Sequence, residues 1–290
     1  MKFPIRFSRY NLDSQGPSNA QCSSGATSGV IVEHNGGYGC MQAWPELGDH
    51  PLEYHLNAMR AGQPTLMGQA CLNCCRIDGD ARRSGINLFS GLVAPTSHSL
   101  LMDVNSHDEI DSLIAKSRAD ALVKIKGTAN LTATLQAVEQ VSRICRVRID
   151  FNSCLDESSF ESFVSSLSKQ AHGRIEFVED PVPYDEAQWR RISERTNVML
   201  ALDWGPNEAV EGFGVRIWKP ARQLEVPPGR THCITHNMDH AIGRAYAVYQ
   251  ASRFNGNLLE CGLDDVLLIG GETGLGLDRV LKDMTWEDLT

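Results

Sequence analysis

Charged residues recur at the ends of successive apolar segments in the middle of this 290-residue chain. Lys124 and Lys126 stand two apart in the segment ALVKIK, so an extended strand points both side chains to one face. The next four segments each end in one ionisable residue, in the order Asp150, Glu179, Asp203 and Lys219. One such residue alone is a solvated strand end. Five successive segments with the same pattern predict side chains that converge at the mouth of a barrel.

The residue types at these positions indicate a reaction. Three carboxylates in one barrel mouth repel one another and do not stay ionised together without a cation. Oxygen ligands from three separate strands suit Mg²⁺ better than zinc, so we predict Asp150, Glu179 and Asp203 as ligands. Two lysines on one strand lower each other's pKa, which makes one of them available as a base. The pattern therefore predicts proton abstraction next to a carboxylate, with Mg²⁺ and lysine stabilising an enediolate.

Short apolar segments alternate with amphipathic ones from about residue 99 onward. We predict strands over 99–103, 121–126, 146–151, 174–179, 199–203, 215–219 and 231–235. Helical periodicity fits 107–117, 130–143, 156–170, 184–195 and 238–253. This alternation predicts a parallel sheet, either doubly wound or closed into a barrel. Lys219 follows Asp203 by only 16 residues and Thr231 follows Lys219 by 12, so the fifth and sixth helices should be short or missing.

The first 95 residues differ from the rest. Residues 28–44 predict two strands joined at Asn35-Gly36-Gly37, whose residues tolerate a positive φ. Helices over 51–61 and 64–78 follow, which makes an α+β module. Cys71, Cys74 and Cys75 in the second helix could bind zinc, but no second cysteine pair lies near in sequence, so we favour packing in the core.

Composition narrows the range of partners. The chain has 27 Lys and Arg against 36 Asp and Glu and no basic cluster, so nucleic acid is not an expected partner. No apolar stretch approaches the roughly 20 residues of a membrane span, and the first residues do not resemble a secretory signal. Nine cysteines without an export signal fit reduced thiols. We expect a cytoplasmic monomer or homodimer that acts on a small-molecule carboxylate.

Three further features have simpler interpretations. His236 and His240 are four apart and could share a helix face, but no zinc-protease Glu follows His236, so a substrate-loop role for it is favoured. The glycines between 270 and 276 resemble a dinucleotide loop, but only 14 residues follow Gly276, too few for the rest of such a unit. Trp204 is expected to pack beneath the site.

The motifs resemble those of the enolase superfamily, in its muconate-cycloisomerase branch. They are Lys124-Ile125-Lys126, Asp150-Phe151-Asn152, Glu179-Asp180-Pro181, Asp203 and Lys219-Pro220. Residues 29–53 resemble the capping hairpin and mobile loop, 237–243 the turn after the seventh strand, 261–264 the segment that closes the barrel, and 274–276 the C-terminal segment. Within the branch the chain is most similar to the o-succinylbenzoate synthase family.

The resemblance implies a fold and a reaction. The fold is an α/β, trimmed (β/α)7β TIM-like barrel with an N-terminal α+β capping domain. The domains would be 1–95 (cap), 96–265 (barrel) and 266–290 (a segment that returns to the cap). The reaction is a syn elimination of water from 2-succinyl-6-hydroxy-2,4-cyclohexadiene-1-carboxylate. Residues 39–50 would close over the barrel mouth.

The resemblance also assigns roles to single residues. Mg²⁺, or Mn²⁺ in its place, would bind the three carboxylates, and Lys126 would move the proton. Lys124 would keep Lys126 partly neutral, and Lys219 would stabilise the anion. The expected substrate contacts are Asn152, His236, Asn237 and Gly262.

Departures from the family keep alternatives open. The capping hairpin reads Cys40-Met41-Gln42 where the family usually has Trp-Gly-Glu. A dipeptide epimerase or N-acylamino-acid racemase would use the same two opposed lysines. Asp264 and Asp265 are adjacent and cannot both face inward on a strand, which argues against the epimerase. Muconate cycloisomerisation is less favoured. A non-catalytic binding relative is the alternative of another class, and the intact set of lysines and carboxylates argues against it.

Overall fold

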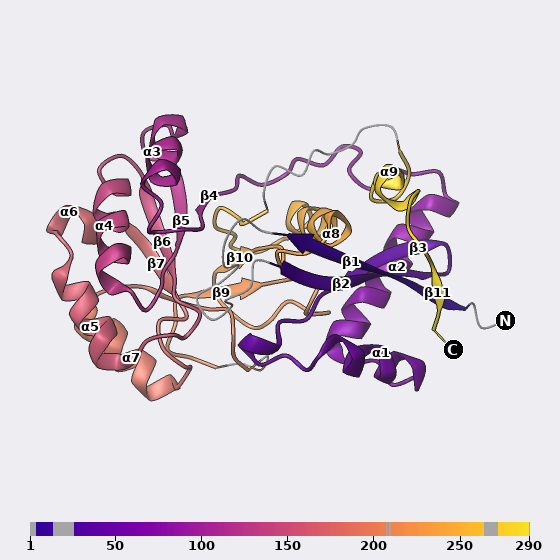
Figure 1. Ribbon diagram of the computed structural model, residues 1–290, viewed down its shortest axis with the longest axis horizontal. Coiled ribbons are helices and arrows are strands. Elements are labelled where there is room, and N and C mark those ends of the chain that lie inside the picture. Colours follow the sequence, from indigo (N-terminus) through magenta and orange to yellow (C-terminus); the bar gives the residue numbers. More distant parts are fainter. Residues whose placement is uncertain (1–3, 14–25, 207, 209, 264–271, 290) are drawn as a thin grey trace.

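The computed structural model describes residues 4–13, 26–206, 208, 210–263 and 272–289. They form two parts, a parallel sheet curled into a barrel and a smaller antiparallel sheet with its helices (Figure 1). The predicted barrel with a capping domain is therefore confirmed. Within these ranges, no helix combines the length and the apolar character that a membrane crossing requires.

The barrel sheet contains seven parallel strands whose spatial order follows the sequence. They are β4 (Ser99–Leu101), β5 (Leu122–Lys126), β6 (Arg146–Asp150), β7 (Ile175–Glu179), β8 (Leu200–Leu202), β9 (Val215–Trp218) and β10 (His232–Ile234). All seven predicted strands are present, each ending at or up to two residues before its predicted last residue. The buried Val, Ile and Leu side chains of β4 to β8 pack with the outer helices in the main core.

A short extended segment closes the ring between the first and last strands. Leu258 and Gly262 form parallel bridges to His232 and Thr235 of the β10 region, and Cys261 forms one to Ser97, just before β4. The backbone N–H of His98 donates to Cys261 O at 2.9 Å. Residues 258–262 thus occupy the eighth strand position.

The outer helices follow only some of the strands. They are α3 (His107–Lys116), α4 (Leu131–Val141), α5 (Glu157–Ser166), α6 (Lys169–His172), α7 (Glu186–Thr196) and α8 (Ala241–Ser252). Among the described residues between β8 and β9, and between β9 and β10, none is helical, as the short spacings predict. The predicted helix over 156–170 is interrupted where Leu167 becomes extended and Ser168 caps α6. His236 precedes α8, so it shares no helix face with His240.

The capping domain contains a four-stranded antiparallel sheet of order β11-β1-β2-β3. Its strands are β1 (Ile5–Asp13), β2 (Ala26–His34), β3 (Gly37–Met41) and β11 (Glu287–Asp288). Its helical elements are η1 (Pro45–Leu47), α1 (Leu52–Arg60), α2 (Leu66–Arg83) and α9 (Asp278–Leu281). The predicted hairpin at Asn35-Gly36-Gly37 and both predicted helices are present. β1 was not predicted, because its charged residues obscure the alternation of Ile5 and Phe7.

Helix α2 packs directly on β3. A Cβ atom on Gly37 would lie 2.0 Å from Cys75 O, and one on Gly39 would lie 2.3 Å from Cys71 O, so only glycine permits this approach. The buried thiol of Cys75 donates to Val32 O at 3.4 Å, and that of Cys74 to Tyr38 O at 3.3 Å. The three clustered cysteines therefore pack in the core, as predicted.

Helix α8 packs on the capping domain, and the C-terminal strand completes the capping sheet. Ile242 and Tyr246 of α8 share a buried cluster with Ile31, Cys40 and Cys74 of the cap. The last strand, β11, pairs with β1, so the C-terminal residues lie on the cap (Figure 1). The domain boundary at residue 95 stays a prediction, and the one at 265 lies outside the described residues.

Asp78 of α2 is fully buried and fixes the C-terminal segment. Its carboxylate accepts hydrogen bonds from Tyr38 N at 3.0 Å, Leu275 N at 2.7 Å and Arg82 Nε at 2.6 Å. We expect Asp78→Ala to lower the free energy of unfolding by about 3 kcal/mol or more, because it leaves buried donors without an acceptor. Urea denaturation measures this change.

Asp80 provides the control on the same helix. Its side chain is 55% exposed and pairs with Arg76 and Arg83 at the surface. Asp80→Ala should cost less than about 1 kcal/mol. Equal losses in the two variants would contradict the role given to Asp78.

Candidate active site

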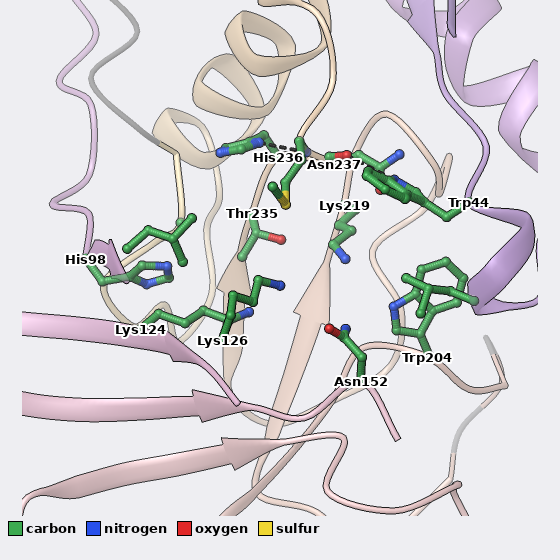
Figure 2. Close-up of a pocket in the computed structure, with 14 residues that line it drawn as sticks. Trp44, His98, Lys124, Lys126, Asn152, Trp204, Lys219, Thr235, His236 and Asn237 are labelled. Carbon is green, nitrogen blue, oxygen red and sulfur yellow. Dashed lines mark hydrogen bonds between the residues drawn. The ribbon is translucent and has the colours of Figure 1, made fainter. Parts of the chain in front are cut away.

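The predicted lysines and carboxylates meet at the carboxyl ends of the barrel strands. Strand register places Lys126 beside Asp150, and Asp150 beside Glu179. Asp203 follows the last residue of β8, and Lys219 follows the last residue of β9. Figure 2 shows Lys124 and Lys126 facing the same space as Lys219 from different strands.

Each carboxylate is paired with a lysine. Lys124 Nζ lies 2.9 Å from Asp150 Oδ2 and 2.6 Å from Glu179 Oε2, and Lys126 Nζ lies 2.6 Å from Asp150 Oδ2. Lys219 forms an ion pair with Asp203. Asp150 and Glu179 are each 1% exposed, so these pairs are shielded from water.

Asp180 is a supporting residue whose role the sequence did not reveal. It is fully buried and accepts hydrogen bonds from Asp203 N at 3.1 Å and Trp204 N at 2.9 Å. Its own φ is +40°, which turns its carboxylate toward the end of β8. Asp180 thereby fixes the backbone that carries Asp203.

Burial and crowding dominate the electrostatics. Burial and the Asp150 carboxylate raise the pKa of Glu179 to about 7, although Lys124 opposes the shift. Burial alone would lower the pKa of Lys124, but Asp150 and Glu179 outweigh it and raise that pKa. The pKa of Lys124 is therefore raised and not lowered as its spacing from Lys126 predicted, because it forms ion pairs with Asp150 and Glu179. The raised pKa of Glu179 agrees with the expectation that the carboxylates do not all stay ionised without added positive charge.

The donor set fits a hard divalent cation. Three carboxylates from adjacent strands supply only oxygen ligands. Glu179 Oε1 is buried and has no hydrogen-bond partner among the described residues. The lysine nitrogens lie between the carboxylates, and within the described part of the chain no three His, Cys, Asp or Glu side chains already form a metal cluster. Binding of a cation therefore requires the carboxylates to exchange their lysine partners.

A cavity lies above these groups. Lys124, Lys126 and Lys219 line it from the barrel. The predicted contact residues also line it: Asn152, His236, Asn237 and Gly262. Asn152 has a φ of +47°, which follows from the sharp turn after β6. Contact of these four residues with a substrate stays a prediction.

The capping domain forms the roof of this cavity. Trp44 and Leu47, from the segment predicted to close over the barrel, both line it. Trp44 Nε1 donates to Asn237 O at 3.2 Å, and Asn237 Nδ2 donates to Gln42 O at 3.0 Å. Asn237 thus also connects the cap to the turn after β10, a structural role that its sequence position did not reveal.

A second connection between cap and barrel involves Trp204. Arg222 forms an ion pair with Asp49 of the cap, and its guanidinium lies 3.7 Å from the centre of the Trp204 ring. Trp204 lines the cavity, with Lys219 Nζ 5.5 Å from its ring centre. The expectation that Trp204 packs beneath the site is wrong, because the turn after Asp203 carries the ring up to the cavity wall.

His98, just before β4, is a cavity residue that the sequence analysis missed. Arg148 Nη1 donates to His98 Nδ1 at 2.9 Å from the barrel interior. Arg148 is fully buried and is held by Glu176 at 2.6 Å and by Glu260 O at 2.7 Å. A lone histidine outside any motif gives no signal in a single sequence.

Comparison with known proteins agrees with this geometry. Residues 5–81 match the family described as the N-terminal domain of O-succinylbenzoate synthase. Over 98% of both chains, the protein is 28% identical to o-succinylbenzoate synthase of Bdellovibrio bacteriovorus. Among solved structures, the N-succinyl Arg/Lys racemase of Bacillus cereus matches with a TM-score of 0.78 at 15% identity, over 99% of this chain and 100% of that one. The muconate lactonizing enzyme of Pseudomonas fluorescens matches with a TM-score of 0.72 at 14% identity, over 98% and 99%.

The solved structures establish the fold, a barrel with a capping domain. The N-terminal match and the full-length alignment show that the chain is similar to o-succinylbenzoate synthase. The resemblance stated from the sequence motifs is thereby confirmed.

Gly262 leaves space that the cavity wall requires. A Cβ atom there would lie 2.8 Å from His98 Cε1 and 3.0 Å from Thr235 Cγ2. We expect Gly262→Ala to lower the free energy of unfolding by about 1–3 kcal/mol through overpacking, measured by urea denaturation. Gly173→Ala is the control, because that glycine has a φ of −70° and its nearest contact would be 3.3 Å. A smaller loss for Gly262→Ala than for the control would contradict this account.

Proposed function

We propose that the protein is a metal-dependent o-succinylbenzoate synthase. It would eliminate water from 2-succinyl-6-hydroxy-2,4-cyclohexadiene-1-carboxylate to form 2-succinylbenzoate. The observation that carries the proposal is that Lys124, Lys126 and Lys219 line one cavity and are paired with three buried carboxylates. They lie beneath a capping domain that matches the synthase N-terminal domain.

Asp150, Glu179 and Asp203 would hold Mg²⁺, or Mn²⁺ in its place. The cation would supply positive charge to the substrate carboxylate as the adjacent carbon loses its proton. It would also relieve the repulsion that raises the pKa of Glu179.

Lys126 would transfer the proton in both halves of the reaction. Its neutral amine takes the proton from the carbon next to the carboxylate, and the electron pair of that C–H bond passes into the carboxylate. The hydroxyl at the neighbouring carbon then leaves with the C–O electron pair, and Lys126 returns the proton to it to form water. The ion pair between Lys126 and Asp150 must open before this step.

Lys219 would act through its charge rather than by proton transfer. It follows the last residue of β9, and the anion would form between it and Lys126, which faces the same space (Figure 2). A fixed ammonium group stabilises charge that develops in a cavity shielded from water. The product ring is aromatic, so the elimination itself is favourable.

An N-acylamino-acid racemase or dipeptide epimerase is the second candidate. The observation that favours it is the pair of lysines on separate strands, because a racemase needs one on each face of the α-carbon. The fold is shared with a racemase from Bacillus cereus. The N-terminal match favours the synthase. A non-catalytic binding relative would have no need of all three lysines.

Metal dependence is the first expected outcome. Dialysis against a chelator should abolish formation of 2-succinylbenzoate, and Mg²⁺ or Mn²⁺ should restore it. Added Mg²⁺ should also raise the melting temperature, because the cation binds only the folded state. Asp203→Asn should lose both effects. If added Mg²⁺ did not change the melting temperature of the wild type, this result would contradict the assigned ligands.

Lysine variants separate the two candidate reactions. Lys126→Ala should lower dehydration by about 10²–10⁴-fold or more, because it removes the group that transfers the proton. Lys219→Arg keeps the positive charge but cannot act as a base, so it should retain a fraction of the synthase activity. Rates are followed by the appearance of 2-succinylbenzoate.

Assays in deuterated water give the complementary test. A synthase should turn over the cyclohexadiene substrate and incorporate no α-deuterium into N-acyl amino acids or dipeptides. Rapid α-exchange without formation of 2-succinylbenzoate would replace the synthase proposal with the racemase or epimerase.

A further inference from the structure

The contact between Arg148 and His98 fixes the hydrogen position on the imidazole. A guanidinium group only donates hydrogen bonds, so His98 Nδ1 must accept from Arg148 Nη1 at 2.9 Å. A neutral imidazole then carries its hydrogen on Nε2. Burial, Lys124 and Arg148 lower the pKa of His98 well below its usual value, which agrees with a neutral ring at pH 7.

The Nε2–H group is available to a ligand. His98 lines the cavity and is partly exposed there, and its ring extends toward the cavity (Figure 2). Its Nδ1 is taken by Arg148, whereas Nε2 has no hydrogen-bond partner within the described ranges. A donor of fixed direction therefore faces the cavity.

His98 belongs to a part of the wall away from the carboxylates. It precedes β4, and the adjoining chain pairs with the closing segment that contains Gly262, next to Thr235. Asp150 and Glu179 end β6 and β7, and Asp203 follows β8, two to four strands away from β4 in the sheet order. For a ligand whose reacting carboxylate is held by those three residues, the cavity that His98 lines is the space open to the remaining atoms.

Two neighbours make this wall suited to a polar group. Gly262 has no side chain, and a Cβ atom there would come within 2.9 Å of His98 Nε2. Thr235 Oγ1 is buried and lacks a hydrogen-bond partner among the described residues. This wall thus combines a glycine, which leaves His98 Nε2 uncovered, with a hydroxyl group that lacks a partner.

We propose that His98 Nε2–H donates a hydrogen bond to an oxygen of the substrate's side arm, the part that does not react. This inference rests on the proposed function, in which that arm is a succinyl group. Its oxygens are a ketone and a terminal carboxylate, and both accept hydrogen bonds. His98 is therefore a residue that selects substrates by their arm, and Arg148 is the positioning residue that orients it.

His98→Asn is the decisive variant. The Asn side-chain oxygen can replace Nδ1 as acceptor for Arg148, but nothing replaces the Nε2 donor. Calorimetry with Mg²⁺ present should give a dissociation constant for 2-succinylbenzoate about tenfold higher than that of the wild type. The constant for benzoate, which has no arm, should not change. 2-Acetylbenzoate, which has the ketone but no terminal carboxylate, identifies the acceptor. The affinity of His98→Asn for this compound should fall as well if the ketone is the partner. It should not change if the terminal carboxylate is the partner.

His98→Gln is the matched control. Its amide nitrogen can occupy the Nε2 position, but it offers Arg148 no acceptor at Nδ1. It should retain part of the arm affinity and lower the melting temperature more than His98→Asn does. Nitrogen-15 NMR of the free wild type should show His98 in the Nε2–H form, assigned by its loss in His98→Asn, and 2-succinylbenzoate should shift that proton.

The remaining outcomes of the binding experiment would contradict either the inference about His98 or the proposed function. Unchanged affinity of His98→Asn for 2-succinylbenzoate would overturn this inference alone. Equal weakening of 2-succinylbenzoate and benzoate would overturn it too, because the variant would then act on the whole cavity. No binding of 2-succinylbenzoate by the wild type would overturn the proposed function, and this inference with it.

Discussion

The structure depends on keeping several like charges buried side by side. The register of adjacent parallel strands places Asp150 next to Glu179, both almost fully shielded from water. Isolated carboxylates could not remain there ionised, and Lys124 bridges the two. Strand register, lysine placement and cation binding are thus linked, because all three determine how the buried negative charges are neutralised. The barrel solves it by fixing the backbone ends from which all these side chains extend.

The barrel has lost outer helices without losing this inner arrangement. The described residues after β8 and β9 form loops, and the outward-facing Arg216 of β9 is nevertheless fully buried. Its guanidinium donates to Pro206 O at 2.7 Å and lies 5.8 Å from the centre of the Phe213 ring. Loop packing on one long side chain covers strands that a helix would otherwise cover. The inward-facing positions alternate with these, so they are unaffected.

The hydrophobic pattern of the sequence was sufficient to predict the barrel strands and the site residues at their ends. The seven barrel strands carry alternating or fully apolar segments, and five successive ones end in or next to a charged residue, so strands and site residues were both predictable. The break between α5 and α6 was not, because an extended Leu167 gives no periodic signal. His98 and Asp180 were missed for another reason. Their roles arise from Arg148 and from the backbone of Asp203, which are distant in sequence.

The departure of the capping hairpin from its relatives has a physical explanation. The position where the family usually has glutamate is Gln42, and its amide Nε2 lies 3.4 Å from Asn237 O and 3.2 Å from Met238 O. A carboxylate could not donate to carbonyl oxygens. The same amide accepts from Tyr10 OH at 3.0 Å through Oε1. Gln42 therefore connects the capping sheet to the turn that carries His236, and movement of the cap must change the cavity wall as well as its roof.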